Sequence, residues 1–467
     1  MKRIILIITA ILFSGLEAYA QAGYNAIYSG TPWYDDRGDI VSAHGACIVK
    51  DNGRYYLFGE KHLDDNNAFA GFNCYSSADL YNWKFESLAL PVQDKGALGP
   101  NSVGERVKVM QCPATKEYVM YMHADSLTYK NQYVGYATAN NITGPYSFKG
   151  PLLFNGQPIR KWDMGTFQDT DGSGYVLLHG GDIYRLADDY KSVTAQVHTA
   201  MEKGFESPAI FRKGDMYYFL GSNLTSWEKN DNYYYTATSL KGPWEKRGLI
   251  APENTLTWNS QTTFVLPIQG TKGTTYMYMG DSWSYPKQAS SATYVWQPLE
   301  VSGTALSIPE FREAWQVDLK TGLAKPITIK GKIVEGNNTK IIRYSSKWMP
   351  RSIDKTPEMV SDTKDAVAII PFTGTQVSLF GTAAPDGGYA KIEIKNSKGK
   401  VVHTALTDYY SKYIFKGLRF ISPVLPKGNY TLTVTVTGIR GNWSDKKKSN
   451  YGSTGYFVSI DTIKVRE

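Results

Sequence analysis

The feature that most constrains the fold is a turn followed by an aromatic strand, which recurs five times before residue 300. Most copies follow a short apolar strand and precede a more polar one. The copies occupy residues 52–59, 116–123, 172–179, 214–221 and 273–280. A degenerate repeat of about 40 to 65 residues is the scale at which radial and solenoid architectures occur. The chain is therefore expected to repeat one small structural unit.

Each repeat predicts a small antiparallel sheet, because short alternating or apolar runs end at Gly, Asn, Asp and Pro. Five sheets around an axis form a five-bladed β-propeller, whose closure protects the sheet edges. A set of unrelated hairpins is the alternative, but the constant order of strands favours the propeller. We expect an all-β chain with this propeller over residues 21–325.

The sequence changes in texture after the repeats. Residues 326–339 are polar and predict a linker or a returning strand, whereas residues 340–467 alternate cleanly between apolar and polar positions. This alternation predicts a two-sheet sandwich, and the segment resembles the jelly-roll modules attached to many carbohydrate-active enzymes. Its aromatic residues either bind sugar or pack in the core and against the propeller; they include Tyr409, Tyr410, Tyr413 and Trp443.

The first 20 residues have the pattern of a cleaved signal peptide. Lys2 and Arg3 precede a short apolar run, and Ala18 and Ala20 flank Tyr19 at the expected cleavage site. No Cys follows that site directly, so we expect a periplasmic or secreted protein without a lipid anchor. No later segment is apolar over a bilayer-spanning length, so membrane insertion is not expected.

Composition excludes some classes of function and leaves others open. The formal charge of +8 is scattered, and without a basic stripe or zinc spacing we expect no nucleic-acid partner. Three cysteines, Cys47, Cys74 and Cys112, are expected as buried thiols, with a Cys47–Cys74 bridge as the alternative. Aromatic residues make up 13% of the chain, which suits both a β-rich core and sugar binding.

Four acidic residues stand where the inner strands should meet a central funnel: Glu60, Glu105, Asp163 and Glu206. A carboxylate beside an inner apolar strand is costly to bury unless it is paired or functional. Each residue alone is more often a solvated acid or an ion-pair partner. The shared register of Glu105, Asp163 and Glu206 in three successive repeats favours a common site.

Residues 24–315 resemble glycoside hydrolase family 43, and most closely its exo-β-1,3-galactanase branch. The resemblance covers nearly the whole propeller and is specific only in combination. The matching stretches are residues 43–46, 56–60, 74–83, 105–106, 163 with 167–169, 205–208, 258–261 and 279–283.

The resemblance implies a five-bladed propeller and hydrolysis with inversion, in which an acid protonates the leaving oxygen while a base activates water. It implies that Glu206 is the general acid and that Asp163 tunes and orients it. Glu105 matches a further essential carboxylate, which contacts the substrate or raises the pKa of the acid.

The expected base is where this chain departs from most of the family. Residues 42–46 lack the Asp found there in most members, and the galactanase branch lacks it too. By resemblance, Gln261 positions the water instead. The alternatives are that Gln261 holds a sugar hydroxyl while another group is the base, or that the protein is an inactive binder.

Four residues are expected to line the sugar pocket: Glu60, His44, Asp281 and Trp283. Carboxylates can hold pairs of sugar hydroxyls, and an aromatic face can stack on the ring. Two of them have plain structural alternatives, because His44 also suits a hydrogen-bonded core position and Trp283 suits packing between blades.

The resulting hypothesis is an exo-acting, inverting hydrolase of β-1,3-galactan. The alternatives are a β-galactofuranosidase or α-arabinofuranosidase on the same fold, and a non-catalytic glycan-binding propeller. Residues 169–174 superficially resemble a calcium loop but lack its later Glu, so structural calcium is not indicated. We expect no required cofactor, no metal site, an oligosaccharide or polysaccharide partner, and a monomer.

Overall fold

The computed structural model describes residues 23–467 except 346, 354–355 and 445–447, so the expected signal peptide lies outside the described residues. The described part is all-β, as predicted, with two four-residue helices, α1 (Leu256–Asn259) and α2 (Gln288–Ser291). None of its helices is long and apolar enough to cross a bilayer. The three cysteines are buried and free, which agrees with the buried-thiol interpretation.

Five successive segments form antiparallel sheets of four strands each, in chain order. The first sheet contains β2 (His44–Asp51), β3 (Arg54–Glu60), β4 (Phe72–Ser77) and β5 (Lys84–Leu90). The second contains β6 (Ser102–Gln111), β7 (Tyr118–Ser126), β8 (Tyr133–Ala139) and β9 (Ser147–Pro151). The third contains β12 (Met164–Gln168), β13 (Gly174–Leu178), β14 (Asp182–Leu186) and β15 (Val193–His198), extended by β10 (Leu153–Phe154) and β11 (Gln157–Pro158).

The fourth and fifth sheets repeat this order. The fourth contains β16 (Glu206–Lys213), β17 (Met216–Ser222), β18 (Tyr233–Ala237) and β19 (Glu245–Leu249). The fifth contains β20 (Gln261–Gln269), β21 (Thr274–Ser282), β22 (Thr293–Ser302) and β23 (Ala305–Ser307). The five predicted aromatic strands are thus the second strands of the five sheets.

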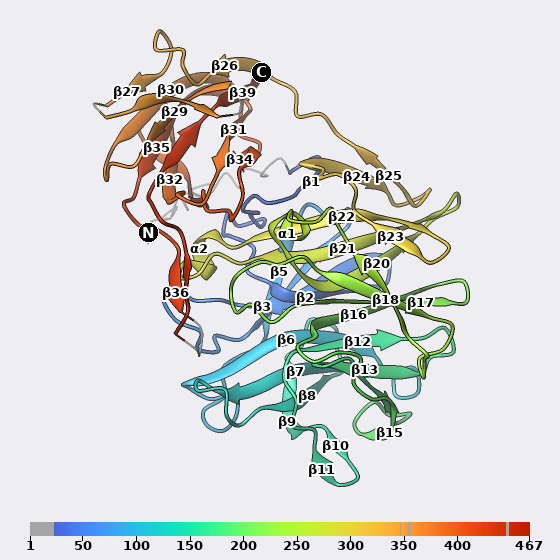
Figure 1. Ribbon diagram of the computed structural model, residues 1–467. Helices are drawn as coiled ribbons and strands as arrows, with labels where there is room; N and C mark the ends of the chain where they lie inside the picture. The colour runs from blue at the N-terminus through green and yellow to red at the C-terminus, as the bar shows by residue number, and fades with distance from the viewer. Residues whose placement is uncertain (1–22, 346, 354–355, 445–447) are drawn as a thin grey trace, which may run out of the picture.

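The five sheets form a closed ring, because their first strands contact one another in turn, and Figure 1 shows the sheets following in chain order from blue to yellow. Each first strand contacts the next, and β20 returns to contact β2. A separate sheet of β1 (Ile27–Tyr28), β24 (Ala314–Asp318) and β25 (Leu323–Pro326) joins the start of the ring segment to its end. This pairing holds the two ends of the ring together.

Apolar clusters fill the space between every pair of neighbouring sheets, including the fifth and the first. The cluster between the first and fifth sheets contains Trp296, Trp315 and Tyr75, each nearly fully buried. Large flat side chains suit these gaps because they bury about 150–250 Å² each. Much of the aromatic content therefore belongs to the packing of the ring.

The C-terminal region begins at β26 (Lys332–Glu335), which lies within the predicted linker and pairs with the last strand. Its first sheet runs in the order β26, β39 (Thr462–Arg466), β31 (Gln376–Ala383) and β34 (Phe415–Ile421). Its second runs β27 (Arg343–Tyr344), β30 (Val367–Gly374), β35 (Gly428–Val436), β32 (Tyr389–Asn396) and β33 (Val401–Asp408). Smaller sheets contain β28 (Met349–Ile353), β29 (Thr356–Ser361) and β38 (Val458–Ile460), and the hairpin β36 (Asn442–Ser444) with β37 (Asn450–Gly452).

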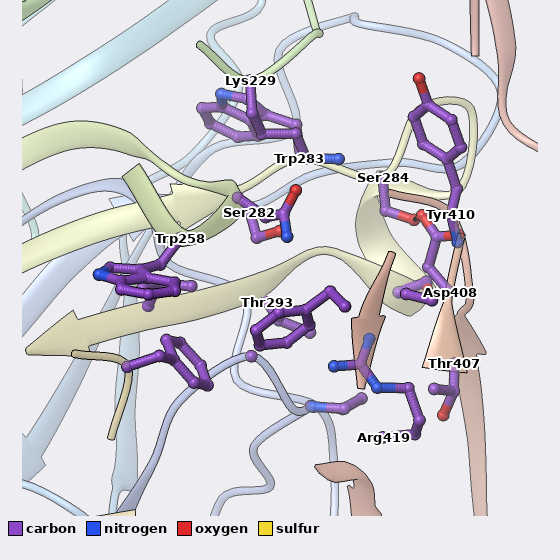
Figure 2. Close-up of a pocket in the computed structure, with 18 residues that line it drawn as sticks. Lys229, Trp258, Ser282, Trp283, Ser284, Thr293, Thr407, Asp408, Tyr410 and Arg419 are labelled. Atoms are coloured by element: carbon purple, nitrogen blue, oxygen red, sulfur yellow. Dashed lines mark hydrogen bonds between the residues drawn. The ribbon is translucent and has the colours of Figure 1, made fainter. Parts of the chain in front are cut away.

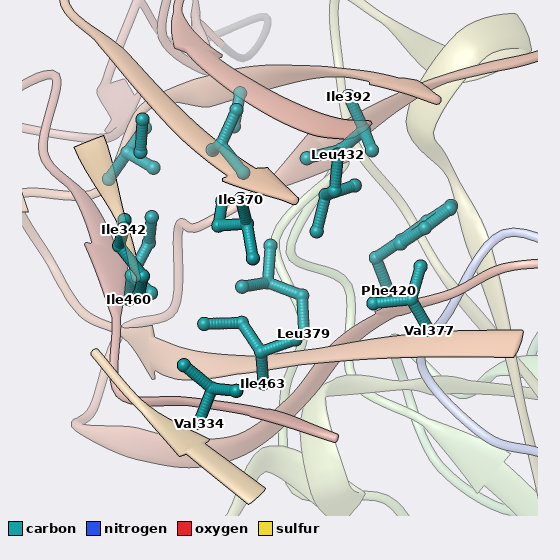
Figure 3. Packing of buried hydrophobic residues seen from close by; sticks show 14 of the residues in the cluster. Val334, Ile342, Ile370, Val377, Leu379, Ile392, Phe420, Leu432, Ile460 and Ile463 are labelled. Atoms are coloured by element: carbon teal, nitrogen blue, oxygen red, sulfur yellow. The ribbon is translucent and has the colours of Figure 1, made fainter. Parts of the chain in front are cut away.

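One apolar core joins the two larger C-terminal sheets (Figure 3). Leu379 and Ile463 come from the first sheet, whereas Ile370, Ile392 and Leu432 come from the second. Every second residue at the end of β35 is buried, which is the pattern of a strand with one face on a core. The predicted alternation thus matches the observed burial.

The C-terminal region also packs onto the ring. Tyr28 and Tyr34 of the ring share an apolar cluster with Phe380, Leu418 and Ile421 of the C-terminal region. Of the four C-terminal aromatics singled out from the sequence, none is exposed: Tyr409, Tyr410 and Trp443 are buried and Tyr413 is half-buried. The packing alternative therefore describes these side chains.

Candidate active site

A cavity of about 780 Å³ opens where the innermost strands of the ring begin. Six of the eight residues selected from the sequence line it: Glu60, Glu105, Asp163, Glu206, Gln261 and Trp283. Glu206 and Gln261 are the first residues of β16 and β20, and Asp163 directly precedes β12. The shared register inferred from the repeats thus places these side chains together.

The inner strands carry an irregularity at the positions that serve this cavity. Pairing shifts register after His44 in β2, after Glu105 in β6 and after Glu206 in β16. Arg106, Asp163 and Ser207 have positive φ values of 57°, 48° and 56°. Bulges of this kind bend a strand and redirect its side chains. They explain how acids at the ends of buried strands reach the cavity.

The buried Arg106 joins three of the cavity residues, two through its guanidinium and one through its backbone N–H. Its Nε lies 2.6 Å from Asp163 Oδ1, and its Nη2 donates a hydrogen bond of 2.6 Å to Gln261 Oε1. The backbone N–H of Arg106 donates to Glu60 Oε1 at 2.7 Å. Sequence reasoning did not select Arg106, although it follows Glu105 directly. A buried arginine needs carboxylate partners. The acids predicted close to Arg106 were therefore the sequence signal that could have identified it as a site residue.

The surroundings of Glu206 favour its protonated form. Burial is the main cause that raises the pKa of Glu206 well above its usual value, and the negative charge of Asp163 raises it further. The Arg106 charge opposes this shift without cancelling it. Asp163 is itself fixed, because it accepts a hydrogen bond from the Ser207 backbone N–H and pairs with Arg106. A carboxylic acid that keeps its proton near neutrality can act as a proton donor.

Glu105 has the opposite electrostatic environment. Burial would raise its pKa, but hydrogen bonds from His123 and Tyr129 and the Arg106 charge more than offset this and hold the pKa of Glu105 below its usual value. Tyr129 Oη donates to Glu105 Oε1 at 2.6 Å, and His123 Nδ1 lies 3.1 Å from Oε2. The pKa values of the two cavity acids Glu206 and Glu105 are therefore shifted in opposite directions.

The environment of His123 is strongly anionic. Burial lowers the pKa of His123, but hydrogen bonds to Asp125 and Glu105 outweigh it and raise the pKa to about 9. His123, Asp125 and Tyr129 all line the cavity, and none was selected from the sequence. His123 and Asp125 lie on β7, and Tyr129 lies in the turn after it. The pairing of β6 with β7 places His123 opposite Glu105, and the sequence alone does not show this pairing.

The amide of Gln261 is fixed by three hydrogen bonds. Its Oε1 accepts from Arg106 Nη2 at 2.6 Å and from Trp283 Nε1 at 2.8 Å, and its Nε2 donates to Ser222 Oγ at 3.0 Å. Because Arg and Trp nitrogens can only donate, they define which end of the amide is the oxygen. One N–H of Gln261 remains for a ligand.

His44 and Asp281, which we expected in the pocket, are not among the residues that line it. Both are almost fully buried, and His44 Nδ1 lies 3.0 Å from Asp281 Oδ1. Asp281 Oδ2 also accepts from the Gly45 N–H, and the His44 ring stacks on Tyr294 with centroids 4.5 Å apart. His44 and Asp281 therefore bond to each other behind the cavity wall. The structure does not place either side chain in the pocket, contrary to the prediction that they contact the sugar.

Aromatic side chains form part of the cavity wall. Trp283 was expected there, whereas Trp162 and Trp227 were not selected from the sequence. Trp227 meets Trp283 edge-on at 5.3 Å and stacks on Tyr285 at 6.0 Å with an interplanar angle of 3°. Flat apolar faces beside polar groups are typical of sugar-binding sites.

The loop that superficially resembles a calcium site has other partners. Asp169 Oδ1 lies 2.8 Å from Arg212 Nη1, and Asp169 Oδ2 accepts from Tyr217 Oη at 2.6 Å. Over the described ranges, no group of three or more His, Cys, Asp or Glu is placed to hold a metal ion.

The cavity combines one acid whose pKa is raised, a second acid whose pKa is lowered, and tryptophan walls, which is an arrangement typical of glycosidases. The family model for glycosyl hydrolases family 43 matches residues 41–248. A structure described as a candidate exo-β-1,3-galactanase from Bifidobacterium bifidum is 37% identical, with a TM-score of 0.57, and the match covers 60% of this chain and 95% of that one. The chain belongs to glycoside hydrolase family 43.

Two further proteins extend the comparison. The exo-β-1,3-galactanase from Phanerochaete chrysosporium, solved with galactose, is 27% identical with a TM-score of 0.68, and the match covers 94% of this chain and 99% of that one. A variant of the same protein was solved with β-1,3-galactotriose. An extracellular endo-α-(1→5)-L-arabinanase from Bacillus subtilis is 28% identical over 243 residues, 47% of this chain. This chain spans about half the length of that curated relative, 48%.

Proposed function

We propose that the protein is an exo-acting, inverting glycosidase that releases galactose from the ends of β-1,3-galactan chains. The observation that carries the proposal is Glu206, a cavity acid whose pKa is raised by burial and by Asp163. The choice of sugar is supported by the relatives that act on β-1,3-galactan or were solved with its fragments.

In this proposal Glu206 gives its proton to the oxygen that leaves with the rest of the chain. Proton donation by a positioned acid contributes about 10² to 10⁴-fold to such reactions. Asp163 keeps Glu206 protonated through its charge, and its bonds to Arg106 and to the Ser207 N–H hold it in place. Glu105 also raises the pKa of Glu206 and, as an ionised acceptor, is suited to hold sugar hydroxyls.

Gln261 is assigned to positioning the attacking water rather than to removing its proton. In the imidic-acid form the amide oxygen would carry a proton, yet Oε1 faces two groups that can only donate. This arrangement favours the ordinary amide, whose free N–H can hold a water oxygen. Glu60, Trp227 and Trp283 complete the proposed sugar site as cavity-wall residues.

We also propose an architecture and a location for this activity. The five sheets are interpreted as the blades of a β-propeller over residues 21–325, and the C-terminal region as a jelly-roll β-sandwich. A signal peptide over residues 1–20 would direct a monomeric protein out of the cytoplasm, where polysaccharide substrates occur. The extracellular arabinanase among the relatives supports that location.

The test compares wild type, Glu206→Gln and a control, Glu202→Gln. Gln has nearly the shape of Glu but no acidic proton, so Glu206→Gln should lower galactose release from β-1,3-galactan by about 10² to 10⁴-fold. Glu202 lies outside the cavity and bonds to Tyr235 and Lys246, so its variant should retain activity. Calorimetric titration with β-1,3-galactotriose should show that Glu206→Gln still binds.

The same assay separates the alternatives. Release from arabinofuranosyl or galactofuranosyl substrates alone would keep the acid assignment and replace the sugar. Binding of galactotriose without release from any substrate by wild type would leave a non-catalytic glycan-binding protein.

A further inference from the structure

The C-terminal region contacts the two ring segments that carry cavity tryptophans. Figure 2 shows this junction, where Ser284 of the ring lies beside Asp408 and Tyr410 of the C-terminal region. A small cavity of about 40 Å³ remains between the two parts and is largely enclosed by side chains from both. The junction is therefore closely packed on the side of the molecule that holds the sugar site.

The first contacted segment is the loop 223–232, between β17 and β18. Four of its residues line the large cavity, among them Trp227. Immediately after Trp227, the buried Glu228 accepts a hydrogen bond of 2.7 Å from Tyr410 Oη, and the Lys229 ammonium lies 5.5 Å from the Tyr410 ring centroid. A hydrogen bond to a buried carboxylate is among the stronger kinds. Tyr410 thus holds this loop from outside the ring.

The second segment follows β21 and carries Trp283. Ser284 Oγ donates to Asp408 Oδ2 at 2.8 Å, and Tyr389 Oη donates to the Ser284 backbone oxygen at 3.0 Å. These bonds fix the residue next to Trp283, whose indole N–H in turn holds Gln261. The C-terminal region therefore supports both sides of the contact between Trp227 and Trp283.

The hairpin β36–β37 brings the C-terminal region to the cavity itself. Trp443 is buried, with its ring 6.5 Å from Tyr285, the residue that stacks on Trp227. The next residue, Ser444, lines the cavity and is exposed, whereas Glu206 is half-buried inside it. Figure 1 shows β36 running alongside the ring near α2. Ser444 therefore lies on the solvent-exposed part of the cavity wall, farther out than Glu206.

We propose that the C-terminal region forms part of the sugar-binding cavity: Tyr410 and Asp408 are positioning residues for Trp227 and Trp283, and Ser444 at the end of β36 borders an outer subsite for the second or later sugar of a chain. This inference rests on the proposed function for the identity of the sugar. It gives the C-terminal region a role at the ring's own cavity, because the four aromatic side chains selected from the sequence for an independent sugar site are buried or half-buried.

The positioning role is tested with Tyr410→Phe in the full chain, and Tyr413→Phe is the matched control. Both remove one tyrosine hydroxyl that bonds across the junction, but Tyr413 Oη accepts from Asn259, which does not line the large cavity. Tyr410→Phe should raise the KM for β-1,3-galactotetraose by about two- to tenfold, with little change in the pH profile of kcat. Tyr413→Phe should leave KM unchanged. Equal KM values for both variants and wild type would overturn the positioning role.

A substrate-free readout separates this inference from the proposed function. Hydrogen–deuterium exchange in residues 223–232 should be faster in Tyr410→Phe than in wild type and unchanged in Tyr413→Phe. If wild type fails to cleave galactan but exchange changes as expected, the proposed sugar is wrong and the positioning role stands. If wild type cleaves galactan and exchange is the same in all three proteins, the positioning role is wrong.

The outer subsite is tested by adding bulk at its border. Ser444→Trp should raise the KM for β-1,3-galactotetraose by about tenfold, and less for β-1,3-galactobiose, because only the longer chain reaches the hairpin. Thr404→Trp on the exposed side of β33 is the control and should behave as wild type. An equal increase for both substrates, or no increase for either, would remove the hairpin from the subsite.

Discussion

Residue by residue, the proposed chemistry depends on how charges are distributed around Arg106. Its guanidinium pairs with Asp163 and bonds to Gln261, so the charge of Asp163 is partly neutralised yet still raises the pKa of Glu206. Glu105 bonds to His123 and Tyr129 instead, and these bonds lower its pKa. The pKa values of two acids in one cavity are thereby shifted apart, as general acid catalysis requires.

Asp163→Asn tests this distribution through pH. Removing the negative charge lowers the pKa of Glu206, so the acid loses its proton at lower pH. The alkaline limb of the kcat/KM profile should therefore move to lower pH, which initial rates across a pH series would measure. Asp171→Asn, in an exposed turn, is the control and should leave the limb in place. An unmoved limb in Asp163→Asn would contradict the assigned role.

His123 predicts a separate dependence of stability on pH. Its folded pKa of about 9 lies above the ordinary value of 6.5, so the protonated imidazole stabilises the fold fully below about pH 6.5, and the contribution is lost as pH rises through 9. The Tm difference between wild type and His123→Gln should be largest near pH 6 and shrink towards pH 9.5. Differential scanning calorimetry at these pH values checks this. A difference that grows with pH would contradict the anionic environment of His123.

The sequence allowed Glu105, Asp163 and Glu206 to be selected because each lies at or near the start of an inner strand in three successive repeats. It could not reveal that His44 and Asp281 bond to each other behind the wall, because both are polar residues at strand ends like the true cavity residues. Partners such as Tyr129 become visible only when the strands are paired and the side chains are placed.

Among the elements, the bulges at the starts of the inner strands decide where the site residues point. In β2 the corresponding position is Gly45, with φ of 59°, and its N–H bonds to Asp281. A Cβ at Gly45 would lie 2.0 Å from Glu60 Oε1 and 3.3 Å from the Arg106 Cα. The glycine is required here because two other inner residues approach its backbone closely.

Gly45→Ala should therefore impair the site, and Gly53→Ala serves as its control. Both glycines have positive φ, so both variants should lose about 1–2 kcal/mol in the free energy of unfolding. No atom lies within 4 Å of a Cβ at Gly53, so only Gly45→Ala should displace Glu60 and lower kcat/KM, by about tenfold or more. Urea unfolding and galactan hydrolysis measure the two effects. Equal activity in both variants would contradict the packing argument.

The repeat also explains which elements could be predicted. The aromatic strands of all five sheets were identifiable because a turn precedes each apolar run, as at 214–221, which becomes β17. The short strands β10 and β11 were not, because two residues give no periodicity. β26 lies where the sequence predicts a linker or a returning strand, and the sequence does not decide between them because only Val334 of this strand enters the core while Lys332, Ile333 and Glu335 are exposed.

In the whole molecule, the ring and the C-terminal region act together around one cavity. The sheet of β1, β24 and β25 holds the two ends of the ring segment together, and an apolar cluster joins the ring to the C-terminal strands. The sequence suggested two domains but not their contact, since burial of Tyr410 and Trp443 depends on the ring surface that they meet. Whether these aromatic residues bind sugar or pack therefore had to be read from the structure.

The central claim is that this cavity releases single galactose units with inversion, and proton NMR of the first products tests it most directly. With β-1,3-galactotetraose as substrate, the account predicts galactose and galactotriose as the only initial products. The galactose should appear first as the α-anomer and then mutarotate, because water attacks from the face opposite the leaving oxygen. Galactose that first appears as the β-anomer, or galactobiose as the first product, would contradict it.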